Sequence, residues 1–206
     1  YLAVKNGLRP LAVHMDNGWN SELATNNIAN LVNGLGVDLY THVIDWQEYK
    51  DLMESFFKAN VIDIELLYDN AMLAVNFQQA NKFGIKYILP GYNSSTEGIG
   101  MPKGWNHFKL DVKNIKNIQK KFGTLALKTM PMLSSLRFKY DQKIKKIQWV
   151  AFLDYFDYKK EEALTLLKND FSYKPYPYKH YESIFTRFYQ GYILPEKFGV
   201  DKRRVH

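Results

Sequence analysis

The sequence predicts an α/β protein in which a parallel sheet is flanked by helices and followed by a mainly helical extension. Short apolar runs alternate with segments of helical periodicity in the first half of the chain, a pattern typical of a parallel sheet covered on both faces. The 206 residues are 46% hydrophobic and 24% charged, an ordinary composition for a globular protein. We therefore expect residues 1–110 to form an α/β core and residues 111–206 to form a helical substrate or partner region.

Three apolar runs are expected to be neighbouring parallel strands: residues 10–15, 39–44 and 85–89. Between the first two, apolar residues from Ala24 to Leu35 recur at helical spacing. Asp45 can cap a second helix, because Glu48 follows three residues later as in a capping box. A third helix is expected over residues 65–83. This alternation orders the strands and helices of the core.

The extension is expected to be helical in five places: residues 112–122, 131–140, 143–155, 159–169 and 181–193. An extended aromatic link is expected at residues 172–180, and residues 201–206 form a basic tag. At the other end, residues 1–7 read as the last turns of a helix stopped by glycine. We therefore expect the chain to continue before Tyr1.

Composition excludes several kinds of site. There is no Cys, which rules out a disulfide framework, a zinc–thiolate site and a thiol nucleophile. No apolar run approaches the roughly 18 residues of a membrane helix. No signal peptide is visible, so a cytoplasmic location is expected. The 28 Lys+Arg against 21 Asp+Glu give a net charge of +7, which attracts phosphate-bearing ligands or only marks a solvated basic surface.

Two loops follow expected strands, where ligands bind in open α/β sheets. Residues 91–98 offer hydroxyl, amide and carboxylate groups suited to phosphate and magnesium, or form an ordinary polar turn. After the first strand, Asp16 could hold a magnesium ion or a ribose, and Asn17 the ribose. Alternatively both bond their own backbone, and His14 is a core residue. No Walker A, GxGxxG, GxSxG or HExxH motif occurs.

A third cluster lies at the start of the last expected helix. A base, acids and cations gather there: Lys179, His180, Glu182 and Arg187. The guanidinium of Arg187 suits a phosphate, since it can donate two parallel hydrogen bonds. His180 could shuttle a proton near neutral pH. The alternative is a solvated helix with a basic face.

These strings together resemble one family. Residues 13–18 with Asn27 and Ile28, residues 91–98 and residues 179–203 are similar to the N-acetyl sugar amidotransferases of bacterial surface-polysaccharide and nonulosonic acid biosynthesis. These enzymes are PP-loop ATP pyrophosphatases with an adenine nucleotide α-hydrolase-like (HUP-like) fold. The family's Ser-Gly-Gly-x-Asp-Ser loop would lie before Tyr1. The resemblance therefore implies a core that lacks its first strand and its PP-loop here.

The resemblance implies a reaction and its cofactors. A sugar acetamido group becomes an acetamidino group through an adenylated intermediate, with ATP and Mg²⁺ as cofactors. A separate glutaminase supplies ammonia, the substrate is an N-acetyl sugar or nucleotide-sugar, and nucleic acid is not expected. Alternatives are another PP-loop enzyme, namely a tRNA-modifying ligase or thiolase or an NAD synthetase-like enzyme, or a non-catalytic nucleotide-binding module.

Site residues are carried over on the same strings. Adenine and ribose are assigned to the end of the first strand and the next loop, with Asp16 as the candidate magnesium ligand: His14, Met15, Asp16, Asn17 and Gly91. Contacts to phosphate, metal or the activated amide are assigned to Asn93, Ser95, Thr96 and Glu97. Sugar binding is assigned to Lys179, His180, Glu182 and Arg187.

Overall fold

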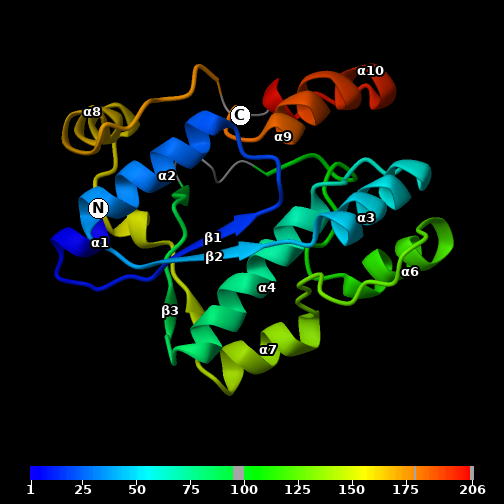
Figure 1. Ribbon diagram of the computed structural model, residues 1–206, viewed down its shortest axis with the longest axis horizontal. Coiled ribbons are helices and arrows are strands. Elements are labelled where there is room, and N and C mark those ends of the chain that lie inside the picture. The colour runs from blue at the N-terminus through cyan, green and yellow to red at the C-terminus, as the bar shows by residue number, and fades with distance from the viewer. Residues whose placement is uncertain (95–99, 179, 205–206) are drawn as a thin grey trace.

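The computed structural model describes residues 1–94, 100–178 and 180–204, and shows a mixed α/β fold with small parallel sheets flanked by helices (Figure 1). The core elements are α1 (Leu2–Lys5), β1 (Ala12–Asp16), α2 (Glu22–Leu35), β2 (Leu39–Val43), α3 (Trp46–Lys58), α4 (Leu66–Lys82) and β3 (Tyr87–Ile88). After them come α6 (Val112–Phe122), α7 (Ser135–Lys143), β4 (Gln148–Trp149), η1 (Phe152–Tyr155), α8 (Lys160–Phe171), α9 (Ile184–Phe188), η2 (Tyr189–Ile193), α10 (Leu194–Phe198) and η3 (Lys202–Arg204).

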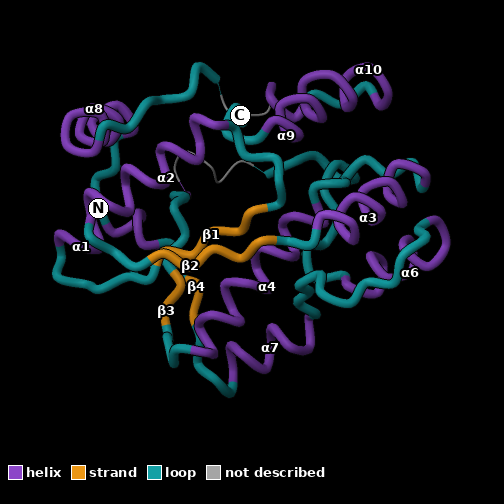
Figure 2. The backbone as a smooth tube through the Cα atoms, in the orientation of Figure 1, coloured by secondary structure: helices purple, strands orange, loops and turns teal. Residues whose placement is uncertain are grey.

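The described strands form two parallel pairs (Figure 2). β1 pairs with β2 along its whole length, from Ala12 opposite Leu39 to Asp16 opposite Val43, as the sequence predicts. β3 is also a strand, but it pairs with β4 and not with β1. The prediction of three neighbouring strands is therefore correct for the first two only.

The prediction of a helix over residues 143–155 is wrong. The preceding helix α7 ends at Lys143, and Lys146 then adopts a left-handed backbone with φ 58°, which a continuing helix does not allow. The chain then runs beside β3, where Gln148 N donates to Lys86 O at 2.7 Å and Val150 N donates to Ile88 O at 2.9 Å. Pairing with a strand about sixty residues earlier overrides the local preference, and η1 follows as a 3-10 turn.

Local signals account for the ends of helices α2 and α3. Ser21 caps α2 by accepting from Ala24 N at 3.2 Å, and Gly36 ends it in the left-handed region at φ 60°. Asp45 caps α3 by accepting from Glu48 N at 2.9 Å. Within the part of the chain that the structure describes, no helix is long and apolar enough to cross a membrane.

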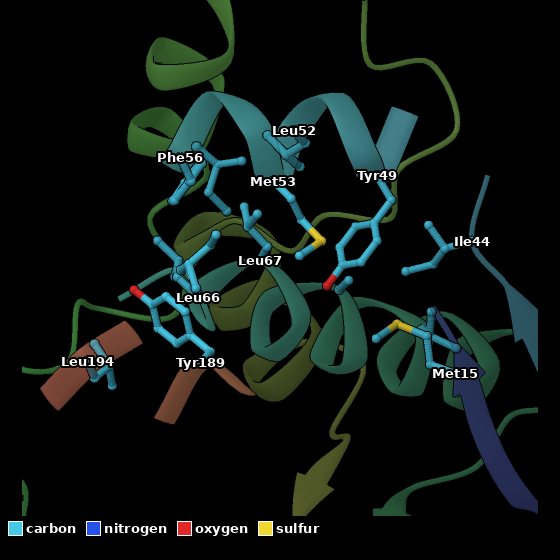
Figure 3. Close-up of a cluster of buried hydrophobic side chains, with 14 of the residues drawn as sticks. Met15, Ile44, Tyr49, Leu52, Met53, Phe56, Leu66, Leu67, Tyr189 and Leu194 are labelled. Carbon is cyan, nitrogen blue, oxygen red and sulfur yellow. The ribbon is translucent and has the colours of Figure 1, made fainter. Parts of the chain in front are cut away.

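The main core lies between α3, α4 and the C-terminal segment, by which we mean residues 180–204 (Figure 3). Leu52 and Phe56 of α3 face Leu67 of α4, and all three are at most 1% exposed. Tyr189 and Leu194 reach the same cluster from the last fifth of the chain. The C-terminal segment is thus packed into the core of the α/β region.

Two buried carboxylates of α3 fix the loop that follows α6. Glu48 accepts hydrogen bonds from the backbone of residues 128–130 at 2.9–3.1 Å. Asp51 accepts from Thr124 and Leu125, including a 2.6 Å bond from Thr124 Oγ1. Burial alone would raise the pKa of Asp51, but these bonds, led by Thr124, lower it to about 2. Both groups therefore act as ionised anchors for the loop.

Candidate substrate pocket

A pocket of about 360 Å³ opens at the carboxyl end of β1. Four parts of the chain line it: the loop after β1, the facing sides of α3 and α4, residues 101–109, and the C-terminal segment. Its polar and charged lining consists of Asn17, Asn20, Tyr49, Glu65, Tyr68, Asp69, Asn106, Lys109, His180, Glu182, Ser183, Thr186, Gln190 and Lys202. Volume and lining are those of a site for a small polar ligand.

Backbone hydrogen bonds attach the C-terminal segment to the loop after β1. Asn20 and Ser183 form an antiparallel bridge. On either side of it, Ser21 N donates to Glu182 O and Ile184 N donates to Trp19 O, both at 2.8 Å. Figure 1 shows α9 and α10 on the side of the molecule toward which β1 points. Segments distant in sequence therefore share one wall of the pocket.

Two lysines and three carboxylates form an ion network beside the pocket. Lys109 Nζ lies 2.7 Å from Asp63 Oδ2 and 2.9 Å from Asp69 Oδ2. Lys202 Nζ lies 2.9 Å from Glu65 Oε2 and 3.5 Å from Asp63 Oδ1. The side chain of Lys202 is only 4% exposed. A lysine so deeply buried requires such partners, since an unpaired charge in that position is costly.

Glu65 also determines how Gln190 is oriented. A carboxylate only accepts hydrogen bonds, so Gln190 presents its amide nitrogen, with Nε2 2.7 Å from Glu65 Oε1. Gln190 Oε1 is buried and has no hydrogen-bond partner among the described residues. Gln190 sits on the π-helical turn η2, a type of turn frequent at functional sites.

Burial and neighbouring charges shift the pKa values of three residues that line the pocket. Burial tends to lower the pKa of Lys109, but Asp69 and Asp63 outweigh burial, so the pKa is raised. Burial also raises the pKa of Asp69, although Lys109 opposes this. Burial, with smaller contributions from Asp69 and Glu182, raises the pKa of Tyr68. The two carboxylates therefore hold Lys109 in its protonated form, and the Lys109 ammonium in turn opposes the effect of burial on Asp69.

The pocket does not fit a triphosphate. Both lysines that line it within the described residues are already paired with carboxylates: Lys109 with Asp63 and Asp69, Lys202 with Glu65. Nor do the described residues contain a group of three or more His, Asp or Glu side chains arranged to hold a metal ion. The ATP and magnesium sites stay predictions.

Only one of the residues predicted at the end of β1 is among the described residues that line the pocket. Asn17 lines it, and its Nδ2 lies 3.4 Å from the hydroxyl of Tyr49. Asp16 Oδ1 accepts from Gly18 N at 2.9 Å, which is the turn that the sequence analysis gave as the alternative. The side chain of Met15 is 4% exposed and belongs to the core (Figure 3).

His14 makes a contact that identifies its tautomer. Asn20 Nδ2 lies 3.1 Å from His14 Nε2 and 3.5 Å from Asp16 Oδ1. Because Asp16 can only accept, the amide nitrogen is the donor, and His14 Nε2 must accept. Burial lowers the pKa of His14 despite the opposing charge of Asp16, so the ring is neutral with its proton on Nδ1.

The predicted loop of residues 91–98 is described only in part. Gly91 is exposed and Asn93 is 3% exposed, whereas Ser95, Thr96 and Glu97 lie outside the described residues. Asp154, which the sequence analysis did not select, accepts from the backbone and hydroxyl of Ser94 at 2.8 and 2.6 Å. Further along this loop, Met101 lines the pocket.

The predicted sugar-binding residues divide into two groups. His180 and Glu182 line the pocket, and His180 Nδ1 lies 3.4 Å from Glu182 Oε1. Arg187 is exposed and does not line the pocket, because its guanidinium lies over the ring of Tyr181 at 5.1 Å. Lys179 lies outside the described residues.

Sequence reasoning missed most of the charged groups of the site: Glu65, Asp69, Lys109 and Lys202. The acids at 63, 65 and 69 precede or begin α4 and were a usable signal, since three carboxylates cluster there. Lys202 was assigned to a basic tag, yet it is buried. Only the fold reveals its partners.

Comparison with known proteins gives one match. No curated protein and no solved structure matches the chain. Residues 182–206 match the family model described as LPS biosynthesis protein WbpG-like, C-terminal domain. The matched residues include Glu182, Gln190 and Lys202 of the pocket. The C-terminal end of this chain is therefore similar to the C-terminal domain of WbpG-like lipopolysaccharide biosynthesis proteins.

Proposed function

We propose that this protein is an ATP-dependent amidotransferase of lipopolysaccharide biosynthesis that converts the acetamido group of an N-acetyl sugar to an acetamidino group. The sugar, or the sugar end of a nucleotide-sugar, occupies the pocket. Ammonia comes from a separate glutaminase, and the reaction takes place in the cytoplasm. ATP would supply the driving force in two steps: the amide oxygen would displace pyrophosphate from the α-phosphate, and ammonia would then displace AMP, which carries that oxygen away.

One observation carries this proposal. The segment that is similar to WbpG-like proteins forms a wall of the pocket, where it contributes Glu182, Ser183, Thr186, Gln190 and Lys202. A segment typical of lipopolysaccharide biosynthesis proteins therefore lies where a ligand would bind. The segment is joined there to the loop at the carboxyl end of β1, the usual ligand position in α/β sheets.

The lining also suits a sugar. Side chains of Asn17, Asn20 and Asn106 offer both donors and acceptors for hydroxyl groups. Phe185 offers an apolar surface for the less polar face of a sugar ring. These groups bind and orient the ligand, and ATP would be held outside the pocket.

The test uses the protein expressed from its whole gene, with ATP, magnesium, ammonium and nucleotide-activated N-acetyl sugars. We expect AMP and pyrophosphate to form only with an N-acetyl sugar, and mass spectrometry to find oxygen replaced by NH in the product. Pyrophosphate release that depends on tRNA, or ATP binding without turnover, would replace this proposal by one of the alternatives.

A matched pair of variants ties the activity to the pocket. Lys202→Gln removes the cation that pairs with Glu65, whereas Lys197→Gln makes the same change at an exposed position of the same segment. The first variant is expected to raise the sugar KM, and the second to keep wild-type kinetics. Equal sugar KM values for Lys202→Gln and Lys197→Gln would show that the sugar does not bind in this pocket.

A further inference from the structure

The pocket carries more negative than positive charge. Three carboxylates and two ammonium groups line it in the described part of the chain: Glu65, Asp69, Glu182, Lys109 and Lys202. Asp63 adds a fourth carboxylate, which does not line the pocket but contacts both lysines. A concave site of this charge favours a cation over a neutral group of the same shape.

Two acceptors in this lining suit N–H donors. The side chain of Asp69 keeps 36% of its surface accessible, and Lys109 bonds to its Oδ2. Gln190 is 5% exposed, lines the pocket, and has a buried Oε1 without a hydrogen-bond partner among the described residues. Because Glu65 holds the amide nitrogen of Gln190, its oxygen is the end left for another donor.

We infer that this pocket recognises an amidinium group, with Asp69 as its carboxylate partner and Gln190 Oε1 as a second acceptor. A planar amidinium, like a guanidinium, can donate two parallel hydrogen bonds to one carboxylate. A neutral amide offers only one donor beside its carbonyl oxygen, and that oxygen would face the carboxylates. The pocket therefore distinguishes the two groups by charge and by donor number.

The inference rests on the proposed function, in which a neutral acetamido group becomes an acetamidino group that is protonated at neutral pH. Positive charge develops at the amide carbon's substituents as ammonia adds. Carboxylates that bind the cationic product also stabilise this developing charge, and such preorganised electrostatic stabilisation accelerates a reaction. Asp69 would then be a catalytic residue that touches the reacting group.

The test compares benzamidine with benzamide, which have the same shape and differ in charge and donor number. Binding to the protein is measured by calorimetry, and the contacts are mapped by NMR chemical shifts. We expect benzamidine to bind tighter by about tenfold, as charge-assisted hydrogen bonds exceed neutral ones. The shifts should centre on Asp69 and Gln190.

Three variants locate the preference. Asp69→Asn keeps the shape and removes the charge, and Gln190→Leu removes the acceptor; each is expected to lower the preference for benzamidine at least about threefold. Asp157→Asn makes the same charge change on a side chain that is 91% exposed, and should keep the wild-type preference. Melting temperatures show whether each variant is folded.

Several results would overturn the inference. Equal affinity of the wild-type protein for benzamidine and benzamide does so without any variant, as do chemical shifts that centre elsewhere. The inference is also overturned if Asp69→Asn and Gln190→Leu both keep the wild-type preference for benzamidine. The proposed function fails separately: a protein that selects benzamidine but releases no pyrophosphate with N-acetyl sugars has the site without the reaction.

Discussion

Replacement of Lys202 by methionine tests the ion network most directly. Met keeps most of the aliphatic chain and removes the ammonium group, which is buried between Glu65 at 2.9 Å and Asp63 at 3.5 Å. Breaking a buried ion pair from one side costs roughly 3–5 kcal/mol, because a charge is left without its partner. Asp63 keeps Lys109 at 2.7 Å, so we expect the lower end, about 3 kcal/mol.

The assay is urea unfolding at pH 7, followed by circular dichroism and by tryptophan fluorescence. Lys197→Met serves as the control, since Lys197 is exposed on the same segment, and should stay within about 0.5 kcal/mol of wild type. The double variant Lys202→Met with Glu65→Gln removes the stranded carboxylate as well. It should therefore recover about 1–2 kcal/mol relative to Lys202→Met alone.

The reasoning is refuted if Lys202→Met and Lys197→Met have the same free energy of unfolding. It is also refuted if Glu65→Gln makes Lys202→Met less stable, because the loss would then not come from an unpaired carboxylate. A changed urea dependence with an unchanged midpoint would point to a looser C-terminal segment instead of a lost ion pair.

Three further predictions concern other parts of the fold. Hydrogen bonds led by Thr124 lower the pKa of Asp51 to about 2 against the raising effect of burial. Its contribution to stability is therefore complete above about pH 4 and is lost as the pH falls toward 2, so Asp51→Asn should flatten the acid limb of urea unfolding. Gly34→Ala would place Cβ 2.6 Å from the ring of Phe171, and we expect a loss of about 1 kcal/mol in thermal unfolding, which Phe171→Leu should relieve. Burial lowers the pKa of His14, so nitrogen NMR shifts should show a neutral ring with the proton on Nδ1, and stability should decline as the pH falls below about 6.5; a charged ring at pH 7 would contradict this.

The sequence by itself determined the parts of the fold that depend on near neighbours. Apolar runs predicted β1 and β2 as parallel strands, and both the side-chain spacing and the Asp45 cap predicted α3. Helical periodicity likewise predicted α6, and α4 was predicted as a helix ended by Gly84. These features are set by contacts within one or two turns or one strand, so the residues that determine them are adjacent in the sequence.

The sequence also singled out two segments that the fold brings together. The loop after β1 was predicted to bind the nucleotide and the segment around His180 the sugar, and residues of both line one pocket. The assignment of Arg187 to phosphate stays a prediction, and its guanidinium lies over the ring of Tyr181 outside the pocket. The side to which a helical residue points depends on how the helix docks, which its own sequence does not specify.

Only the tertiary structure decided which charged groups meet. Lys202 bonds to Glu65 across 137 positions, and Lys109 bonds to Asp63 across 46. β4 forms because Gln148 and Val150 reach the backbone of β3, although the local pattern favoured a helix. Ion pairs and strand pairs of this kind depend on distance in space, and a buried lysine and an exposed one look the same in sequence. For this reason the sequence predicted the strands and helices that carry the pocket, whereas its acidic lining became visible only in the folded chain.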